Sequence, residues 1–157
     1  MSEIAVFLLW GIAATAVSDL WQRAVLRALG QPAPGWGSVG RWVLGFAEGR
    51  LVDTALKSRP ARPNENAAGW AFHYLVGAGY GLLYGWMLAL LGLESSFGAA
   101  VLFGIATLAG PMLLMKPAMG GGVFGLKAAN PWPGMAKTVS AHLSFGIGLW
   151  LAALVTG

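Results

Sequence analysis

The chain has 157 residues, of which 57% are hydrophobic and only 10% are charged, whereas about a quarter of the residues of a soluble domain are charged. This composition excludes an ordinary soluble protein and predicts a single transmembrane domain over residues 1–157. The absence of cysteine excludes disulfides and thiolate chemistry. The formal charge of +4 comes without the basic, aromatic-rich surface that nucleic-acid binding needs.

The first apolar segment, residues 4–22, is long enough to cross a bilayer once, since a helix rises about 1.5 Å per residue. Glu3 stands where a signal peptide has basic residues, so we expect this segment to be retained. Asp19 costs roughly 2.5–3.5 kcal/mol in lipid and should face the bundle interior. Its predicted helix face also carries the small or polar residues Gly11, Thr15, Ser18 and Gln22.

The long connection 23–66 contains apolar residues at helical spacing, namely Val39, Trp42, Val43 and Phe46. This spacing predicts a short helix that lies in the cytoplasmic interface of the membrane. An irregular loop is the alternative, because three glycines in the same stretch weaken a helix.

Three further spans are predicted at residues 67–91, 97–115 and 135–155. The five-residue link 92–96 should join two of them in a tight antiparallel hairpin. The predicted fold is therefore all-α, an integral membrane four-helix bundle. All 10 lysines and arginines lie in or beside the connections 23–66 and 116–134, so the positive-inside rule places these connections in the cytoplasm and both termini outside.

The two halves of the chain share short motifs in the same order. Leu9–Ala13 resembles Leu102–Ala106, and a His-x-x-x-Gly-x-Gly pattern begins at both His73 and His142. Each half holds two spans, so we predict two helical hairpins that form a parallel repeat about an axis along the membrane normal.

In the second span, glycines occupy every fourth position from 69 to 85 except position 73, which is His73, and this stripe lets another backbone approach closely. We expect helix-packing roles for these glycines and for one in the fourth span, namely Gly69, Gly77, Gly81, Gly85 and Gly146.

The ionisable residues of the spans, whose burial in lipid costs free energy, are predicted to lie at one depth in the membrane, near its cytoplasmic side. Asp19 lies near the end of the first span, and His73 and His142 lie near the starts of the second and fourth. We predict a ligand-binding or proton-handling cluster of Asp19, His73, His142, Ser18, Tyr74 and Thr138, entered past Glu65, Lys116 and Asn130.

The two histidines allow four interpretations. They form structural hydrogen bonds between helices, or they exchange protons with the Asp19 carboxyl group. Alternatively, they ligate haem b as an imidazole pair, with Gly69 and Gly77 clearing room for the porphyrin, or they join Asp19 in a metal site. The sequence has no motif for nucleotide binding or serine catalysis, and it does not favour an enzyme.

Over nearly its whole length the chain resembles a family of small bacterial inner-membrane proteins catalogued only as a domain of unknown function. The shared motifs are Ala-Thr-Ala-x-x-Asp at 14–19, Trp-Gly-x-x-Gly-Arg-Trp at 36–42, Gly-Trp-x-x-His-Tyr at 69–74, Pro-Ala-x-Gly at 117–120, Asn-Pro-Trp at 130–132 and the motif that begins at His142. Asn66 and Lys116 depart from the expected pattern. The resemblance implies the bacterial inner membrane and no assigned activity.

We therefore expect a polar site inside the membrane that faces the cytoplasm and serves proton or small-solute transport, or ligand binding. The alternatives are an accessory or structural subunit of a membrane complex and a bis-histidine haem b protein. The expected partners are membrane lipids and either further copies of the chain or another membrane protein.

Overall fold

The computed structural model describes residues 1–156, and within that range the chain is helical and has no strand. Four helices are long and apolar enough to cross a membrane, namely Glu3–Ala28, Glu65–Leu91, Phe97–Ala118 and Trp132–Thr156. The prediction of an all-α membrane bundle with four spans is confirmed, and the chain is a multi-pass membrane protein.

The residues form two compact units. The bundle unit contains residues 1–33, residues 74–107 and the residues from 139 on. The loop unit contains residues 34–73 and 108–138. That the two units belong to one domain stays a prediction.

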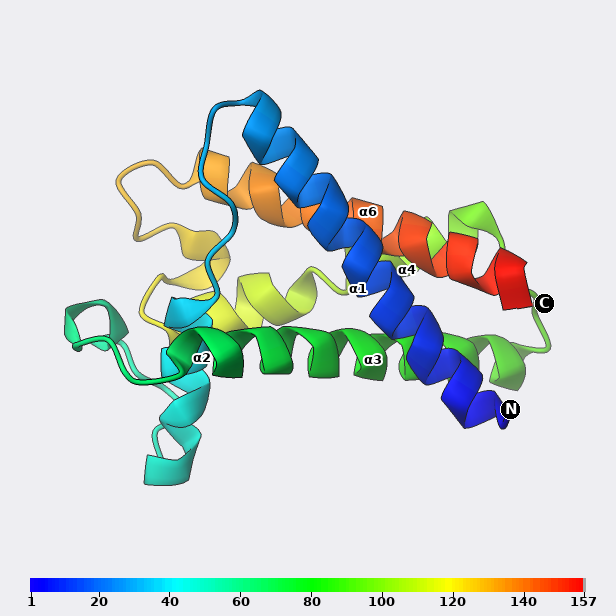
Figure 1. The fold of residues 1–157 in the computed structure, drawn as a ribbon, viewed down its shortest axis with the longest axis horizontal. Coiled ribbons are helices and arrows are strands. Elements are labelled where there is room, and N and C mark those ends of the chain that lie inside the picture. Colours follow the sequence, from blue (N-terminus) through cyan, green and yellow to red (C-terminus); the bar gives the residue numbers. More distant parts are fainter. Residues whose placement is uncertain (157) are drawn as a thin grey trace. The chain divides into compact units, whose positions relative to one another are not determined.

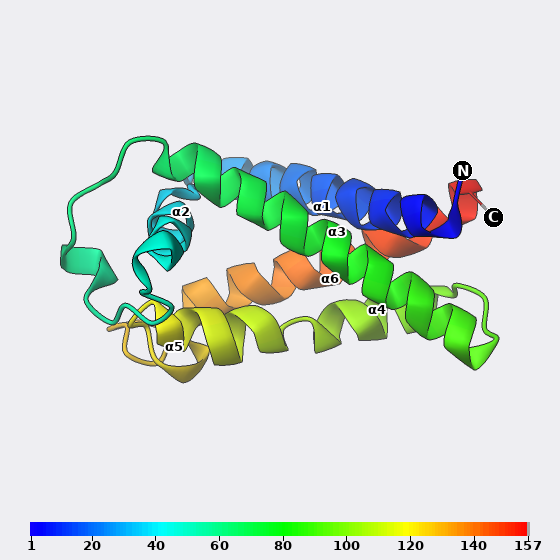
Figure 2. The same cartoon turned by 90° about the horizontal axis from the view of Figure 1, so that it is seen from below.

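Four helices build the bundle unit: α1 (Glu3–Ala28), most of α3 (Glu65–Leu91), α4 (Phe97–Ala106) and most of α6 (Trp132–Thr156). Figure 2 shows α1 alongside α3, and α6 alongside α4. The indole of Trp10 donates to the hydroxyl of Thr156 (2.7 Å), and that of Trp21 donates to Ser140 (2.8 Å), so α1 and α6 run antiparallel. Both chain ends therefore lie at the same end of this unit (Figure 1).

Close contacts at glycines define the remaining helix pairs. A Cβ on Gly11 of α1 would overlap the backbone at Gly77 of α3. A Cβ on Gly104 of α4 would lie 2.9 Å from the Cα of Gly146 in α6. Each crossing needs a glycine because the two backbones touch there.

An aromatic and aliphatic core fills the bundle unit toward the chain termini and the short link between α3 and α4. The buried core residues are Ala14, Tyr84, Leu88, Ala100, Phe103, Phe145 and Leu149. Large side chains such as Leu75 and Leu90 are 71% and 87% exposed. Apolar residues thus cover the outside as well as the core, as a lipid solvent requires.

Two helices differ most from their predictions. The first helix continues past residue 22 to Ala28, because residues 23–28 are good helix formers and Arg27 lies in the last turn, where the helix dipole favours a cation. The third span is interrupted: α4 ends at Ala106, and a π-helix, η3 (Gly110–Met115), follows before α5 (Lys116–Ala118). Pro111 lacks the N–H that would continue an α-helix.

The loop unit contains α2 (Gly37–Leu44), so a short helix forms where the spacing predicted one. Three short 3₁₀ turns follow along the chain, η1 (Phe46–Glu48), η2 (Leu56–Ser58) and η4 (Val123–Gly125). The indole of Trp42 anchors α2 by donating to the carbonyl of Leu51 at 2.8 Å. The position of α2 at a membrane interface stays a prediction.

Candidate functional site

The break in the third span brings a histidine and a threonine together in the bundle unit. The hydroxyl of Thr107, the residue after α4, lies 2.7 Å from Nδ1 of His142 on α6. The same hydroxyl donates to the carbonyl of Gly104 at 2.6 Å. Which of the two groups donates in the Thr107–His142 contact depends on the tautomer of the imidazole.

The C-terminal end of α1 contributes three more polar contacts in the same unit. Ser18 donates to the carbonyl of Ala141 at 2.8 Å, and its hydroxyl lies 3.3 Å from that of Ser144. Asp19 interacts with the hydroxyl of Tyr74 on α3. Each of these contacts joins α1 to another helix, and all lie at the end of the unit opposite the chain termini.

Gln22 lies one turn beyond Ser18 and is only 8% exposed. Its amide nitrogen Nε2 is buried and has no hydrogen-bond partner among the described residues. A buried donor without an acceptor costs free energy, so native proteins almost always satisfy such a group with protein, water or ligand. The polar end of the bundle unit therefore retains hydrogen-bonding capacity.

His73 has different surroundings, in the loop unit. Its ring stacks on Trp36 with centroids 3.9 Å apart and planes 24° apart, and Trp70 lies 5.9 Å away. The hydroxyl of Thr138 bonds within its own helix, to the carbonyl of Gly134 at 2.8 Å. The structure joins Asp19 to Tyr74 within the bundle unit; the convergence of all six predicted residues stays a prediction.

The glycine stripe is occupied by other parts of the same chain. Within the loop unit, Gly69 lies against Trp36. Within the bundle unit, the other glycines lie against α1 or α4: Gly77 against Thr15, Gly81 against Gly11 and Phe7, Gly85 against Phe7, and Gly146 against Ala100 and Val101. The haem hypothesis needs space for a porphyrin beside Gly69 and Gly77. Trp36 fills the space at Gly69 and Thr15 fills the space at Gly77, so a porphyrin does not fit there.

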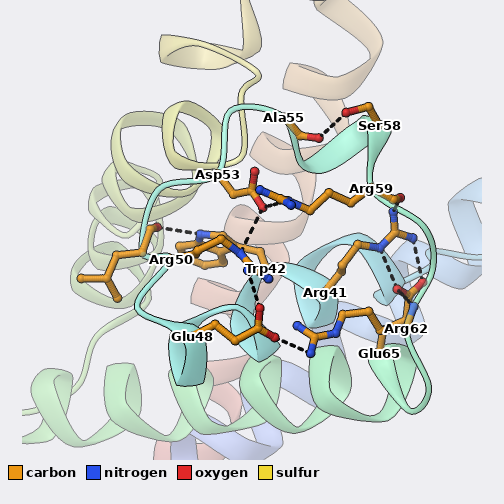
Figure 3. Close-up of polar contacts among 11 residues, drawn as sticks. Arg41, Trp42, Glu48, Arg50, Asp53, Ala55, Ser58, Arg59, Arg62 and Glu65 are labelled. Atoms are coloured by element: carbon orange, nitrogen blue, oxygen red, sulfur yellow. Dashed lines mark hydrogen bonds and ion pairs between the residues drawn. The ribbon is translucent and has the colours of Figure 1, made fainter.

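Glu65, one of the predicted entrance residues, is held in an ion pair in the loop unit (Figure 3). Both of its oxygens accept from the Arg41 guanidinium, at 2.8 and 3.0 Å, and the backbone N–H of Arg62 donates to it at 2.9 Å. Arg41 also donates to the carbonyl of Arg59 at 2.7 Å. This bidentate pair ties α2 to the start of α3 and gives the carboxylate a structural role.

Two more carboxylates of the loop unit pair with arginines in Figure 3. Asp53 pairs with Arg59 and, at 3.8 Å, with Arg50. Glu48 pairs with Arg50 and Arg62. The hydrogen bond from Arg59 holds the pKa of Asp53 below its usual value, and the bond from Arg62 does the same for the pKa of Glu48.

The other two predicted entrance residues, Lys116 and Asn130, line one pocket of the loop unit with a volume of about 270 Å³. The ammonium group of Lys116 lies 3.2 Å from the sulfur of Met112. Residues 1–156 contain no group of three or more His, Asp or Glu side chains placed to hold a metal ion.

A comparison with known families covers nearly the whole chain. The family described as "protein of unknown function (DUF2938)" matches residues 8–156. The chain belongs to the DUF2938 family. No curated protein and no solved structure matches this DUF2938 chain.

Sequence reasoning missed several partners of the site residues in this DUF2938 protein. Thr107 was not singled out, although Pro111, four residues later in an apolar run, signals a helix break beside it. The Trp36–His73 stack and the Arg41–Glu65 pair also went unpredicted. Their residues lie far apart in the sequence and on a loop, where spacing carries no information about pairing.

Proposed function

We propose that this DUF2938 protein is a bacterial inner-membrane protein that moves protons, alone or together with a small polar solute, through the polar end of its bundle unit. The observation that carries the proposal is the hydrogen bond between Thr107 and His142 at the interrupted third helix. Broken helices inside a membrane occur where the backbone is buried in protein or lines a cavity, and in transporters they mark binding sites. Histidine is the side chain whose ordinary titration lies nearest neutral pH.

Neighbouring polar groups of the bundle unit support the same role. Ionisable and polar side chains inside a membrane are expensive and usually functional. The Asp19–Tyr74 contact supplies a carboxyl group and a phenol, and Gln22 supplies an amide donor that lacks a partner among residues 1–156. Together with His142, these groups offer donors and acceptors to a proton, a water molecule or a polar solute.

The proposed orientation follows from the charges. The 10 basic residues lie in or beside the connections that build the loop unit, so that unit faces the cytoplasm and the termini face outward. Because the chain has no cysteine, single cysteines test this directly. Glu94→Cys should react with an impermeant maleimide in intact spheroplasts, and Lys57→Cys only after permeabilisation; the reverse pattern would refute the orientation.

We also propose that the two hairpins are a parallel repeat. The motif alignment pairs Gly11 with Gly104 and Gly77 with Gly146. The same four glycines form the two close crossings, one in each half of the chain: Gly11 with Gly77, and Gly104 with Gly146. The second glycines of the motifs differ, since Gly148 packs against Ala14 while Gly79 has open space beside it.

Proton flux in proteoliposomes with an internal pH dye and an imposed potassium-diffusion potential tests the function. Wild-type protein should acidify or alkalinise the lumen according to the sign of the potential. His142→Ala should lower the rate by about tenfold or more, because general proton transfer by a positioned side chain contributes roughly 10²–10⁴-fold. The exposed Lys137→Gln variant is the control. The proposal would be refuted if the wild-type protein showed no proton flux, or if the wild type, His142→Ala and Lys137→Gln had equal rates.

The accessory-subunit alternative loses its main motivation, because the glycine stripe packs within the chain itself. Association with further copies of the chain or with another membrane protein remains a prediction, which native mass analysis of gently solubilised membranes tests. For the haem alternative, Soret absorption of purified protein after haem supplementation is the corresponding test.

A further inference from the structure

The loop unit contains a pocket that the proposed transport role does not use. Its volume is about 270 Å³, slightly below the range of about 300–1,000 Å³ that is usual for drug-sized ligands. Three parts of the loop unit line it: the start of α2 with the turn η2, the segment 116–128, and the start of α6. The lining residues are Ser38, Leu56, Lys57, Lys116, Met119, Gly121, Gly125, Ala128, Asn130, Pro131 and Gly134.

The only charged residues among those that line the pocket are Lys57 and Lys116. The three carboxylates of the loop unit, Glu48, Asp53 and Glu65, are each paired with an arginine. Neither lysine has an ion-pair partner among residues 1–156. Two lysines without ion-pair partners among the residues that line one pocket favour an anion over a cation there.

Lys116 is partly buried, and the chain folds closely around it. The N–H of Gly121 donates to the carbonyl of Lys116 at 2.8 Å. Gly125 has a φ of 79°, and a Cβ there would lie 3.2 Å from Cδ of Lys116. The thioether of Met112 is a weak acceptor for its ammonium group. Thus, the loop confines this ammonium group without supplying a negative charge.

We infer that this pocket binds a phosphate group through Lys57 and Lys116. Lysine binds phosphate as a compact point charge, whereas the bidentate fork that suits carboxylates belongs to arginine, and the arginines here are engaged elsewhere. The phosphate group comes either from the headgroup of an anionic lipid or from a soluble phosphate compound. The inference is independent of the transport proposal, since it uses the loop unit alone.

Two binding measurements on the full-length protein in detergent micelles test the inference and separate the sources. The first titrates inorganic phosphate by calorimetry against chloride at equal ionic strength. The second counts phosphatidylglycerol and phosphatidylcholine molecules retained in native mass spectra. Saturable phosphate binding identifies a soluble ligand, and selective retention of phosphatidylglycerol alone identifies a lipid.

Lys116→Gln and Lys57→Gln should each weaken the observed binding by about tenfold. Each variant loses an ammonium–phosphate hydrogen bond, and hydrogen bonds between charged groups are stronger than those between neutral groups. Lys137→Gln removes the same charge outside the pocket and should leave binding unchanged. Lys57 is exposed, so its variant should fold normally even if the Lys116 variant does not. Absence of both kinds of binding, or equal weakening by Lys57→Gln and Lys137→Gln, would overturn the inference.

Discussion

The imidazole Nδ1 of His142 lies 2.7 Å from the hydroxyl of Thr107, at the point where the third membrane helix stops being an α-helix. The same hydroxyl also lies within hydrogen-bond distance of the carbonyl of Gly104. The contact therefore links a break in the backbone to the chemistry of a titratable side chain.

Replacing Thr107 by Val should remove this link while keeping the side-chain shape. Nδ1 of His142 would lose its hydrogen-bond partner, which costs roughly 1–3 kcal/mol where the group is left unsatisfied, and the pH dependence of proton flux should change. Thermal unfolding in detergent and the flux assay measure the two effects. Thr138→Val removes a hydroxyl that bonds only within its own helix; an equal effect of both variants would contradict the assigned role.

The close approach of α1 and α3 predicts opposite effects for two neighbouring glycines. A Cβ on Gly77 would overlap the hydroxyl of Thr15, whereas nothing lies within 4 Å of a Cβ on Gly79. Gly77→Ala should destabilise the fold by about 1–3 kcal/mol. Gly79→Ala should be neutral or stabilise it by up to about 1 kcal/mol. Denaturation in mixed micelles compares them, and equal stabilities would contradict the crossing.

The buried amide of Gln22 predicts a conflict between stability and activity. Gln22→Met replaces a donor that lacks an acceptor among residues 1–156 by an apolar group of similar length, and should stabilise the fold by about 1 kcal/mol. The same variant should transport more slowly if the amide contacts the transported species. Gln31→Met, at an exposed position, is the matched control. A Gln22→Met protein that is less stable than the wild type would show that the amide is satisfied in the fold.

The ion pairs of the loop unit predict acid sensitivity. The pKa of Asp53 is lowered in the folded protein, chiefly by the hydrogen bond from Arg59. Its stabilising contribution is therefore complete above the ordinary value of 3.8 and is lost as the pH falls through the lower folded value. Melting temperatures measured from pH 6 downward should fall less steeply for Asp53→Asn than for the wild type. Glu94→Gln is the control, and parallel curves for all three proteins would contradict the pairing.

Hydropathy predicted the four spans, and the helical spacing of Val39, Trp42, Val43 and Phe46 predicted the short helix α2, because both signals are local in sequence. The length of the first helix was underestimated, since charge at residues 23 and 27 ends a hydrophobic run without ending a helix. The third span was predicted as continuous because hydropathy does not register the missing N–H of Pro111.

The candidate site was predictable only in part. Spacing placed Ser18 and Gln22 on one face of α1, and both are buried. Depth predicts that His73 and His142 share a site, and their convergence stays a prediction. The structure gives them different neighbours, Trp36 for one and Thr107 for the other, and no spacing rule connects either pair.

Cysteine accessibility at position 22 tests most directly whether the polar end of the bundle unit is open to the cytoplasm. The wild-type chain contains no cysteine, so Gln22→Cys has a single thiol. We predict that a small, cationic thiol reagent labels this protein in inverted vesicles, whereas Ala14→Cys, at a fully buried position, stays unlabelled. Labelling of position 22 no faster than position 14, or only from the opposite side of the membrane, would contradict the account.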